Sequence, residues 1–226
     1  MKKTFYTEAA YFFGILILAI GTAFMERGNF GMSMVVAPAY ILHLKISEFL
    51  PFFSFGMAEY TLQFVLLILL AAVMRRVKIG YLLSFGTAVI YGFTLDLCLW
   101  AVSFLPGEGI AARLFFFLAG MVLCSVGVAM LFRTYFPPEA YELFVKEVAE
   151  RYHFSISKCK TVYDCVSCLV SIVLSFAFFG FGHFEGVKLG TVFCALINGW
   201  MIGRIAAWME KKFDFRDAWK LRRYIG

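Results

Sequence analysis

A run of about twenty apolar residues, from Phe55 to Met74, constrains the fold of this chain more than any other feature. An α-helix of that length, at about 1.5 Å per residue, crosses the hydrocarbon core of a bilayer. Glu59 nevertheless lies inside the run, and Gln63 follows four residues later on the same helical face. A carboxylate at that depth costs a few kcal/mol unless it is paired, protonated or hydrated. The run therefore predicts a membrane helix whose Glu–Gln face meets other polar groups inside the bilayer.

The rest of the chain has the composition of a membrane protein. Of its 226 residues, 62% are hydrophobic and 16% charged, whereas about a quarter of the residues of a soluble domain are charged. The apolar residues form runs that are long enough to span a membrane at 9–25, 53–74, 81–105, 112–132, 161–182 and 187–209. We therefore expect an all-α polytopic membrane protein with six transmembrane helices.

Two shorter segments follow the first and fourth spans. The apolar stretch 32–42 is too short to span and is interrupted by Pro38, and 137–152 begins with two prolines and has apolar residues at helical spacing. Non-helical backbone is tolerated at membrane depth only where it is buried in protein or lines a cavity. We predict that both segments form short re-entrant or interfacial helices.

Most of the Lys and Arg residues behind the formal charge of +6 lie outside the apolar runs, including those of the basic tail 211–226. Lys and Arg concentrate at the N-terminus, after the second and fourth spans, and in the tail, so the positive-inside rule predicts that both termini are cytoplasmic. This distribution favours contact with anionic lipid headgroups over a nucleic acid as partner.

The chain reads as two related halves. Gly21–Arg27 resembles Gly127–Arg133, and further features recur in the same order: Pro38 and Tyr40 with Pro138 and Tyr141, Glu59 with Asp164, and Gly86-Thr87 with Gly190-Thr191. Three spans per half give the halves opposite orientation, which is the inverted-repeat plan of many secondary transporters. We expect a first three-helix repeat at 1–106, a second at 107–210, and the tail.

The candidate site consists of polar residues inside or at the ends of the apolar runs: Arg27, Glu59, Gln63, Asp96, Arg133, Asp164 and Asn198. Buried carboxyl groups are suited to proton coupling or to binding a cationic solute, and arginines to binding an anionic group. The alternatives are structural: for Glu59 and Asp96, pairing with Arg27 or a hydrogen bond to a neighbouring helix; for the arginines, snorkelling at helix ends; for Asp164, snorkelling or helix capping; and for Asn198, an interhelical bond. Both interpretations stay open.

No pattern points to an enzyme, a metal or a cofactor. The chain has no Gly-x-Ser-x-Gly, Walker or HExxH motif. Most of its six cysteines fall inside apolar runs, and Cys165-x-x-Cys168 has neither a second such pair nor a nearby pair of histidines. We expect these two cysteines to be small packing residues.

Several of these motifs together carry a family resemblance. The Gly-rich first span, the segment Gly31-Met-Ser-Met-Val-Val-Ala-Pro38, the Gly-Thr helix openings and Asp96 resemble the YczE/YyaS/YitT group of bacterial integral membrane proteins. The resemblance implies a multi-pass protein of the bacterial cytoplasmic (inner) membrane. Members are discussed as transporters, some beside regulators that use pyridoxal phosphate, so a vitamin-B6-like solute is implied.

The sequence thus predicts a transporter of a small polar solute, with a polar midplane cavity between the repeats and the lipid bilayer around it. Two alternatives remain: a substrate-capture subunit of an energy-coupling-factor vitamin importer, and a membrane-embedded regulatory or interaction protein. Whether the chain forms a homo-oligomer or joins transporter partner subunits stays open.

Overall fold

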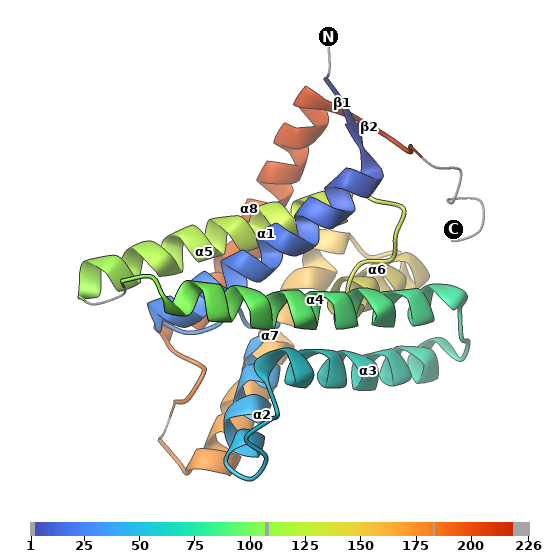
Figure 1. Ribbon diagram of the computed structural model, residues 1–226. Helices are drawn as coiled ribbons and strands as arrows, with labels where there is room; N and C mark the ends of the chain where they lie inside the picture. Colours follow the sequence, from blue (N-terminus) through green and yellow to red (C-terminus); the bar gives the residue numbers. More distant parts are fainter. Residues whose placement is uncertain (1–2, 107–108, 183, 219–226) are drawn as a thin grey trace.

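The computed structural model describes residues 3–106, 109–182 and 184–218, and these are almost entirely helical (Figure 1). Six of their helices are long and apolar enough to cross a membrane: α1 (Thr7–Gly28), α3 (Phe55–Met74), α4 (Ile79–Ser103), α5 (Ile110–Leu131), α7 (Ile156–Phe179) and α8 (Leu189–Lys212). Two shorter helices are present as well: α6 (Ala140–Tyr152) lies within the predicted segment 137–152, whereas α2 (Ala37–Ser47) begins and ends five residues later than the predicted segment 32–42. The expectation of an all-helical chain with six apolar spans is confirmed.

Among the six spans, the start of α7 differs most from the prediction. The helix begins at Ile156 rather than near residue 161, because Ser155 caps it by accepting a hydrogen bond from the backbone N–H of Lys158. A hydroxyl at the N-cap satisfies one of the free N–H groups of the first turn. The extension brings the polar residues 158–160 into the helix.

The helices α1 and α5 lie antiparallel and side by side at the centre of the molecule (Figure 1). Glycines let their backbones touch: a Cβ added to Gly21 would lie 2.9 Å from the carbonyl oxygen of Gly120, and one added to Gly120 would lie 2.6 Å from that of Gly21. Gly14 and Gly127 make the same reciprocal contact, at 3.3 and 2.8 Å. We call these four positions the glycine seam, a form of the close packing that small residues permit in membranes.

The same neighbours flank the glycine seam on each side. The helix α4 packs on α1 and α3, and α8 packs on α5 and α7, while α2 and α6 each contact both α3 and α7. The segments that leave the seam are also held alike. After α1, the carbonyl of Phe30 accepts a 3.0 Å hydrogen bond from the N–H of Gly190 in α8, and after α5, the carbonyl of Pro137 accepts one of 3.0 Å from Thr87 in α4.

A short parallel strand pair joins the two ends of the chain (Figure 1). The strand β1 (Lys3–Tyr6) pairs with β2 (Phe213–Arg216), with Lys3 opposite Phe213. Just after β1, the Thr7 hydroxyl donates a 2.8 Å hydrogen bond to Asp217. The predicted basic tail therefore begins as a strand, and its residues 219–226 lie outside the described part of the chain.

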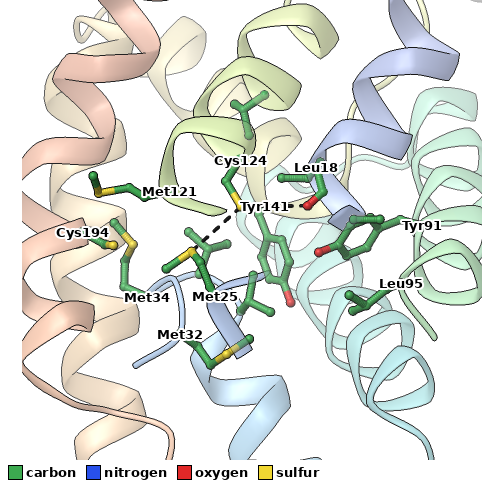
Figure 2. Packing of buried hydrophobic residues seen from close by; sticks show 14 of the residues in the cluster. Leu18, Met25, Met32, Met34, Tyr91, Leu95, Met121, Cys124, Tyr141 and Cys194 are labelled. Carbon is green, nitrogen blue, oxygen red and sulfur yellow. Dashed lines mark hydrogen bonds between the residues drawn. The ribbon is translucent and has the colours of Figure 1, made fainter. Parts of the chain in front are cut away.

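The core around the glycine seam is rich in sulfur. Figure 2 shows Met25, Cys124 and Cys194 packed together, with the rings of Tyr91 and Tyr141 beside them. Both tyrosines are large side chains that are completely or almost completely buried, at 0% and 2% exposure. Outside this core, large apolar side chains of the long helices are exposed, as expected for a surface that faces lipid: Leu82, Phe93, Leu97, Phe115, Val162 and Leu169.

Candidate functional site

Charged and polar side chains gather in the interior where α3, α6 and α7 meet. We call this group the buried cluster. Its members are less than 9% exposed and come from α3 (Glu59 and Gln63), from the start of α6 (Glu139, Tyr141 and Glu142) and from α7 (Lys160 and Asp164). Charged residues are almost never so fully buried unless they are paired, so the cluster requires an explanation.

Gln63 links Glu59, on its own helix α3, to the start of α6. Its side-chain nitrogen donates hydrogen bonds to the carboxyl groups of Glu59, at 3.4 Å, and Glu139, at 3.2 Å, and its oxygen accepts one of 3.0 Å from the N–H of Ala140. Tyr141 donates a 2.9 Å hydrogen bond to Oε2 of Glu59. Within the described residues, Oε1 of Glu59 and Oε1 of Glu139 have no hydrogen-bond partner.

The α7 side of the cluster contains its one ammonium group. Lys160 Nζ lies 3.1 Å from Oδ1 of Asp164, one helical turn further on, and 3.4 Å from Oε1 of Glu142. It also lies 5.7 Å from the centre of the Tyr163 ring. The lysine therefore offsets two of the four acids of the cluster.

Burial and the neighbouring charges favour a bound proton on Glu139. Glu139 lies outside the six spans, and burial raises its pKa well above the usual value of 4.5. The negative charges of Glu142 and Glu59 raise the pKa of Glu139 further, whereas the hydrogen bond from Gln63 and the charge of Lys160 lower it. Burial also raises the pKa of Tyr141, so its hydroxyl remains a hydrogen-bond donor. The raised pKa values favour the protonated forms of Glu139 and Tyr141.

A small cavity of about 30 Å³ adjoins the cluster. Both halves of the chain line it, and its polar lining residues include Thr22, Ser33, Tyr91, Glu139, Tyr141, Glu142, Lys160 and Asn198. Since one water needs roughly 10–15 Å³ of such space, the cavity has room for about two. We call it the central cavity.

The structure separates the sequence-predicted residues into two groups. Glu59, Gln63 and Asp164 belong to the buried cluster. Asn198 lines the central cavity and accepts a 2.8 Å hydrogen bond from Ser125, so it also has the interhelical bond that was the structural alternative.

The other three lie elsewhere. Asp96 accepts hydrogen bonds from the Ser54 hydroxyl, at 2.5 Å, and from the N–H of Gly56, at 2.8 Å, so it ties the end of α4 to the start of α3. Arg133 forms an ion pair of 3.2 Å with Glu210, which is exposed on α8. Arg27 lines a different cavity.

Sequence reasoning missed Glu139, Tyr141, Glu142 and Lys160. The segment 137–152 has the pattern of a surface helix, but Ser84 and Thr87 of α4 donate hydrogen bonds of 2.6 and 3.0 Å to the carbonyls of Pro138 and Pro137. Both prolines precede the first residue of α6, so their carbonyls lie outside its hydrogen-bond ladder. The bonds from α4 hold this segment inside the bundle. A usable signal was the spacing of Lys160 and Asp164, four residues apart on one helical face.

Together these features define a polytopic helical membrane protein with a charged cluster buried between its two halves. The chain belongs to DUF6198, a family of unknown function, which it matches over residues 5–207. That match includes the glycine seam and the whole buried cluster. No curated protein and no solved structure matches the chain.

Proposed function

We propose that the protein is a carrier that exchanges a small amine-bearing solute for protons across the bacterial cytoplasmic membrane. One observation carries this proposal: the buried cluster holds four acids and a single lysine, and Glu139, Glu142 and Lys160 of that cluster line a cavity to which both halves of the chain contribute. Such an excess of buried acid is costly unless protons or a cation neutralise it. A solute ammonium and protons would compete for the same carboxyl groups, and this competition couples their movements.

We further propose that the two halves are inverted repeats. The glycines of the seam support this. Gly14 and Gly21 lie 106 residues before Gly120 and Gly127 (120 − 14 and 127 − 21), and the contacts are reciprocal: Gly14 meets Gly127, and Gly21 meets Gly120. The shared neighbours of α1 and α5 support it as well. In this scheme α2 and α6 are equivalent re-entrant helices, and alternate opening on the two sides of the central cavity moves the solute.

The helix caps refine which residues correspond. Ser54 caps α3 and Ser155 caps α7, each by accepting a hydrogen bond from the N–H three residues later. Counted from these serines, Glu59 is equivalent to Lys160 and Gln63 to Asp164. This alignment replaces the pairing of Glu59 with Asp164 that the sequence suggested. At this one pair of equivalent positions, the first half would therefore have an acid and the second half the lysine.

The resemblance to the YczE/YyaS/YitT group makes a B6-like vitamin a candidate solute. Among the forms of such a vitamin, pyridoxamine carries an amine that matches the negative excess of the cluster, whereas a phosphate ester would add to it. The central cavity has room for about two waters, so the structure corresponds to a closed state in this scheme.

Uptake of labelled pyridoxamine into proteoliposomes with an acidic lumen tests the proposal, and protein-free liposomes measure passive trapping of the amine. We expect Glu59→Gln and Glu139→Gln to reduce uptake to the protein-free level. Glu150→Gln, at an exposed position of α6, is the matched control and should retain it. Normal uptake by both cluster variants would refute the proposal. Binding of the solute without unaided uptake would instead favour a capture subunit that needs partner proteins.

A further inference from the structure

A second cavity lies apart from the buried cluster. It measures about 200 Å³ and shares no lining residue with the central cavity. It is formed where the end of α1, the helix α2, the start of α3 and the end of α4 come together, and we call it the α1–α4 cavity. Its lining residues are Glu26, Arg27, Tyr40, His43, Phe55, Leu99, Val102 and Ser103.

Two adjacent residues give this cavity both signs of charge. Arg27 donates a 2.7 Å hydrogen bond from Nη2 to the carbonyl of Leu105, but its Nε is buried and has no partner within the described residues. The Glu26 carboxylate likewise accepts no hydrogen bond and forms no close ion pair within that part of the chain. A buried donor without an acceptor costs free energy, so Arg27 is prepared to bind an anionic group.

The remaining walls suit a small ring. The side chains of Tyr40 and His43 pack against Phe55, with ring centres 5.2 and 6.0 Å away. His43 Nδ1 lies 2.8 Å from the carbonyl oxygen of Phe53. Since a carbonyl only accepts, that nitrogen carries the hydrogen, and Nε2 of the neutral ring is free to accept one.

The hydroxyl of Tyr40 adds a donor. Burial, and then the negative charges of Glu26 and Glu185, raise the pKa of Tyr40 to about 12, so the phenol stays protonated. A cavity of roughly 150 Å³ is known to hold benzene. A space of about 200 Å³ therefore fits one six-membered ring with short polar substituents.

We infer that the α1–α4 cavity binds a small zwitterion. Its ammonium group lies against the Glu26 carboxylate, its anionic group accepts from Nε of Arg27, and its apolar part packs on Phe55. Binding there does not depend on transport. Its use as the entry site of the carrier, from which the solute moves to the central cavity, rests on the proposed function.

Three ligands with the same ring test the inference on the unaltered protein. Phenylalanine carries both charges, phenethylamine only the positive one, and 3-phenylpropionate only the negative one. In detergent solution at about pH 7.5, we expect phenylalanine to raise the unfolding temperature and to bind about tenfold or more tightly than either analogue, which is the effect of losing one charged partner. Equal binding of phenethylamine would overturn the role of Arg27, and no stabilisation by phenylalanine would overturn the site.

Variants then assign the charges. We expect Arg27→Gln to remove the advantage of phenylalanine over phenethylamine, and Glu26→Gln its advantage over 3-phenylpropionate. Glu48→Gln, in an exposed ion pair with Lys45 at the end of α2, is the control and should bind as the unaltered protein does. Unchanged ligand preference in both test variants would overturn the inference.

The buried cluster separates this inference from the proposed function. Glu139→Gln should leave phenylalanine binding unchanged while it abolishes pyridoxamine uptake. If Glu139→Gln abolishes phenylalanine binding and the two cavity variants do not, the ligand occupies the central cavity and the inference is wrong. Normal uptake by Glu139→Gln and Glu59→Gln, with intact binding, would refute the carrier and leave the α1–α4 site standing.

Discussion

The hydroxyl of Tyr141, at the start of α6, donates a 2.9 Å hydrogen bond to Oε2 of Glu59, near the start of α3. The two residues are 82 positions apart and belong to different halves of the chain. Both side chains are almost fully buried, at 2% and 0% exposure. The bond therefore joins the halves in the interior of the protein, where loss of the donor would leave a buried acceptor unpaired.

Removal of this hydroxyl should destabilise the protein. We expect Tyr141→Phe to lower the free energy of unfolding by about 1–3 kcal/mol, because a buried acceptor loses its donor. Unfolding in detergent, followed by circular dichroism, measures the change. Tyr152→Phe, at a position that is 50% exposed, is the control, and an equal response of the two variants would contradict the importance of the bond.

The stability of the protein should depend on pH through Glu139. Its pKa is raised above the ordinary 4.5, first by burial and then by the charges of Glu142 and Glu59. The folded protein therefore holds this proton more tightly than the unfolded chain does. Its contribution to stability is complete below about pH 4.5 and is lost as the pH rises through the raised pKa.

Glu139→Gln removes that titration and should flatten the profile. Compared with this variant, the unaltered protein should lose stability progressively as the pH rises from about 4.5 through the raised pKa of Glu139. Melting temperatures across that range provide the test. Parallel profiles for the two proteins would show that Glu139 does not titrate in the folded state.

Loss of the lysine from the cluster should be more severe. Lys160→Met leaves the carboxyl groups of Glu142 and Asp164 buried without their cation, and breaking a buried ion pair in this way costs about 3–5 kcal/mol. A second change, Asp164→Asn, should restore part of the stability because it removes one uncompensated acid. A double-mutant cycle measures this coupling, and purely additive effects would indicate that the pair makes no net contribution.

The glycine seam should reject even one methyl group. We expect Gly120→Ala to destabilise the protein by about 1–3 kcal/mol, since its Cβ would lie against the backbone of Gly21 and force α1 and α5 apart. Gly86→Ala, where a Cβ would meet nothing within 4 Å, should be neutral. Thermal stability of the two purified variants makes the comparison, and a neutral Gly120→Ala would mean that the seam is looser than its geometry indicates.

Asp96 should matter for folding rather than for solute exchange. Its carboxylate binds the Ser54 hydroxyl and the N–H of Gly56, so Asp96→Ala removes a cap from α3 at a cost of about 0.5–2 kcal/mol. We expect pyridoxamine uptake per folded molecule to persist in this variant. Complete loss of uptake with normal stability would contradict this and indicate that Asp96 belongs to the solute site.

The long helices could be predicted because length and hydropathy alone determine which segments can cross a bilayer. Glu59 and Gln63 were recognisable for the same reason, since a carboxylate inside such a segment needs a polar partner. The partners themselves were not recognisable. Glu139 and Tyr141 reach Glu59 only because the chain between α5 and α6 enters the bundle, and this path depends on hydrogen bonds from α4 to Pro137 and Pro138.

Helix ends were a second source of error. Asp96 and Arg133 have the sequence context of interior charges, yet each finds its partner at the end of another helix: Asp96 at the start of α3 and Arg133 near the end of α8. Sequence spacing specifies the face of a helix on which a residue lies, but the neighbour of that face is fixed only by tertiary packing. The two arginines, similar in sequence context, accordingly lie in different environments.

The glycine seam limits how this molecule can change shape. Where two backbones are in direct contact, no flexible side chains separate them that could rearrange to let the helices slide. We therefore expect α1 and α5 to move as one rigid unit. A conformational change would instead rotate the α3–α4 pair and the α7–α8 pair relative to the α1–α5 unit. The distance between spin labels on the α3–α4 and α7–α8 pairs should then change, while the distance between labels on α1 and α5 should not.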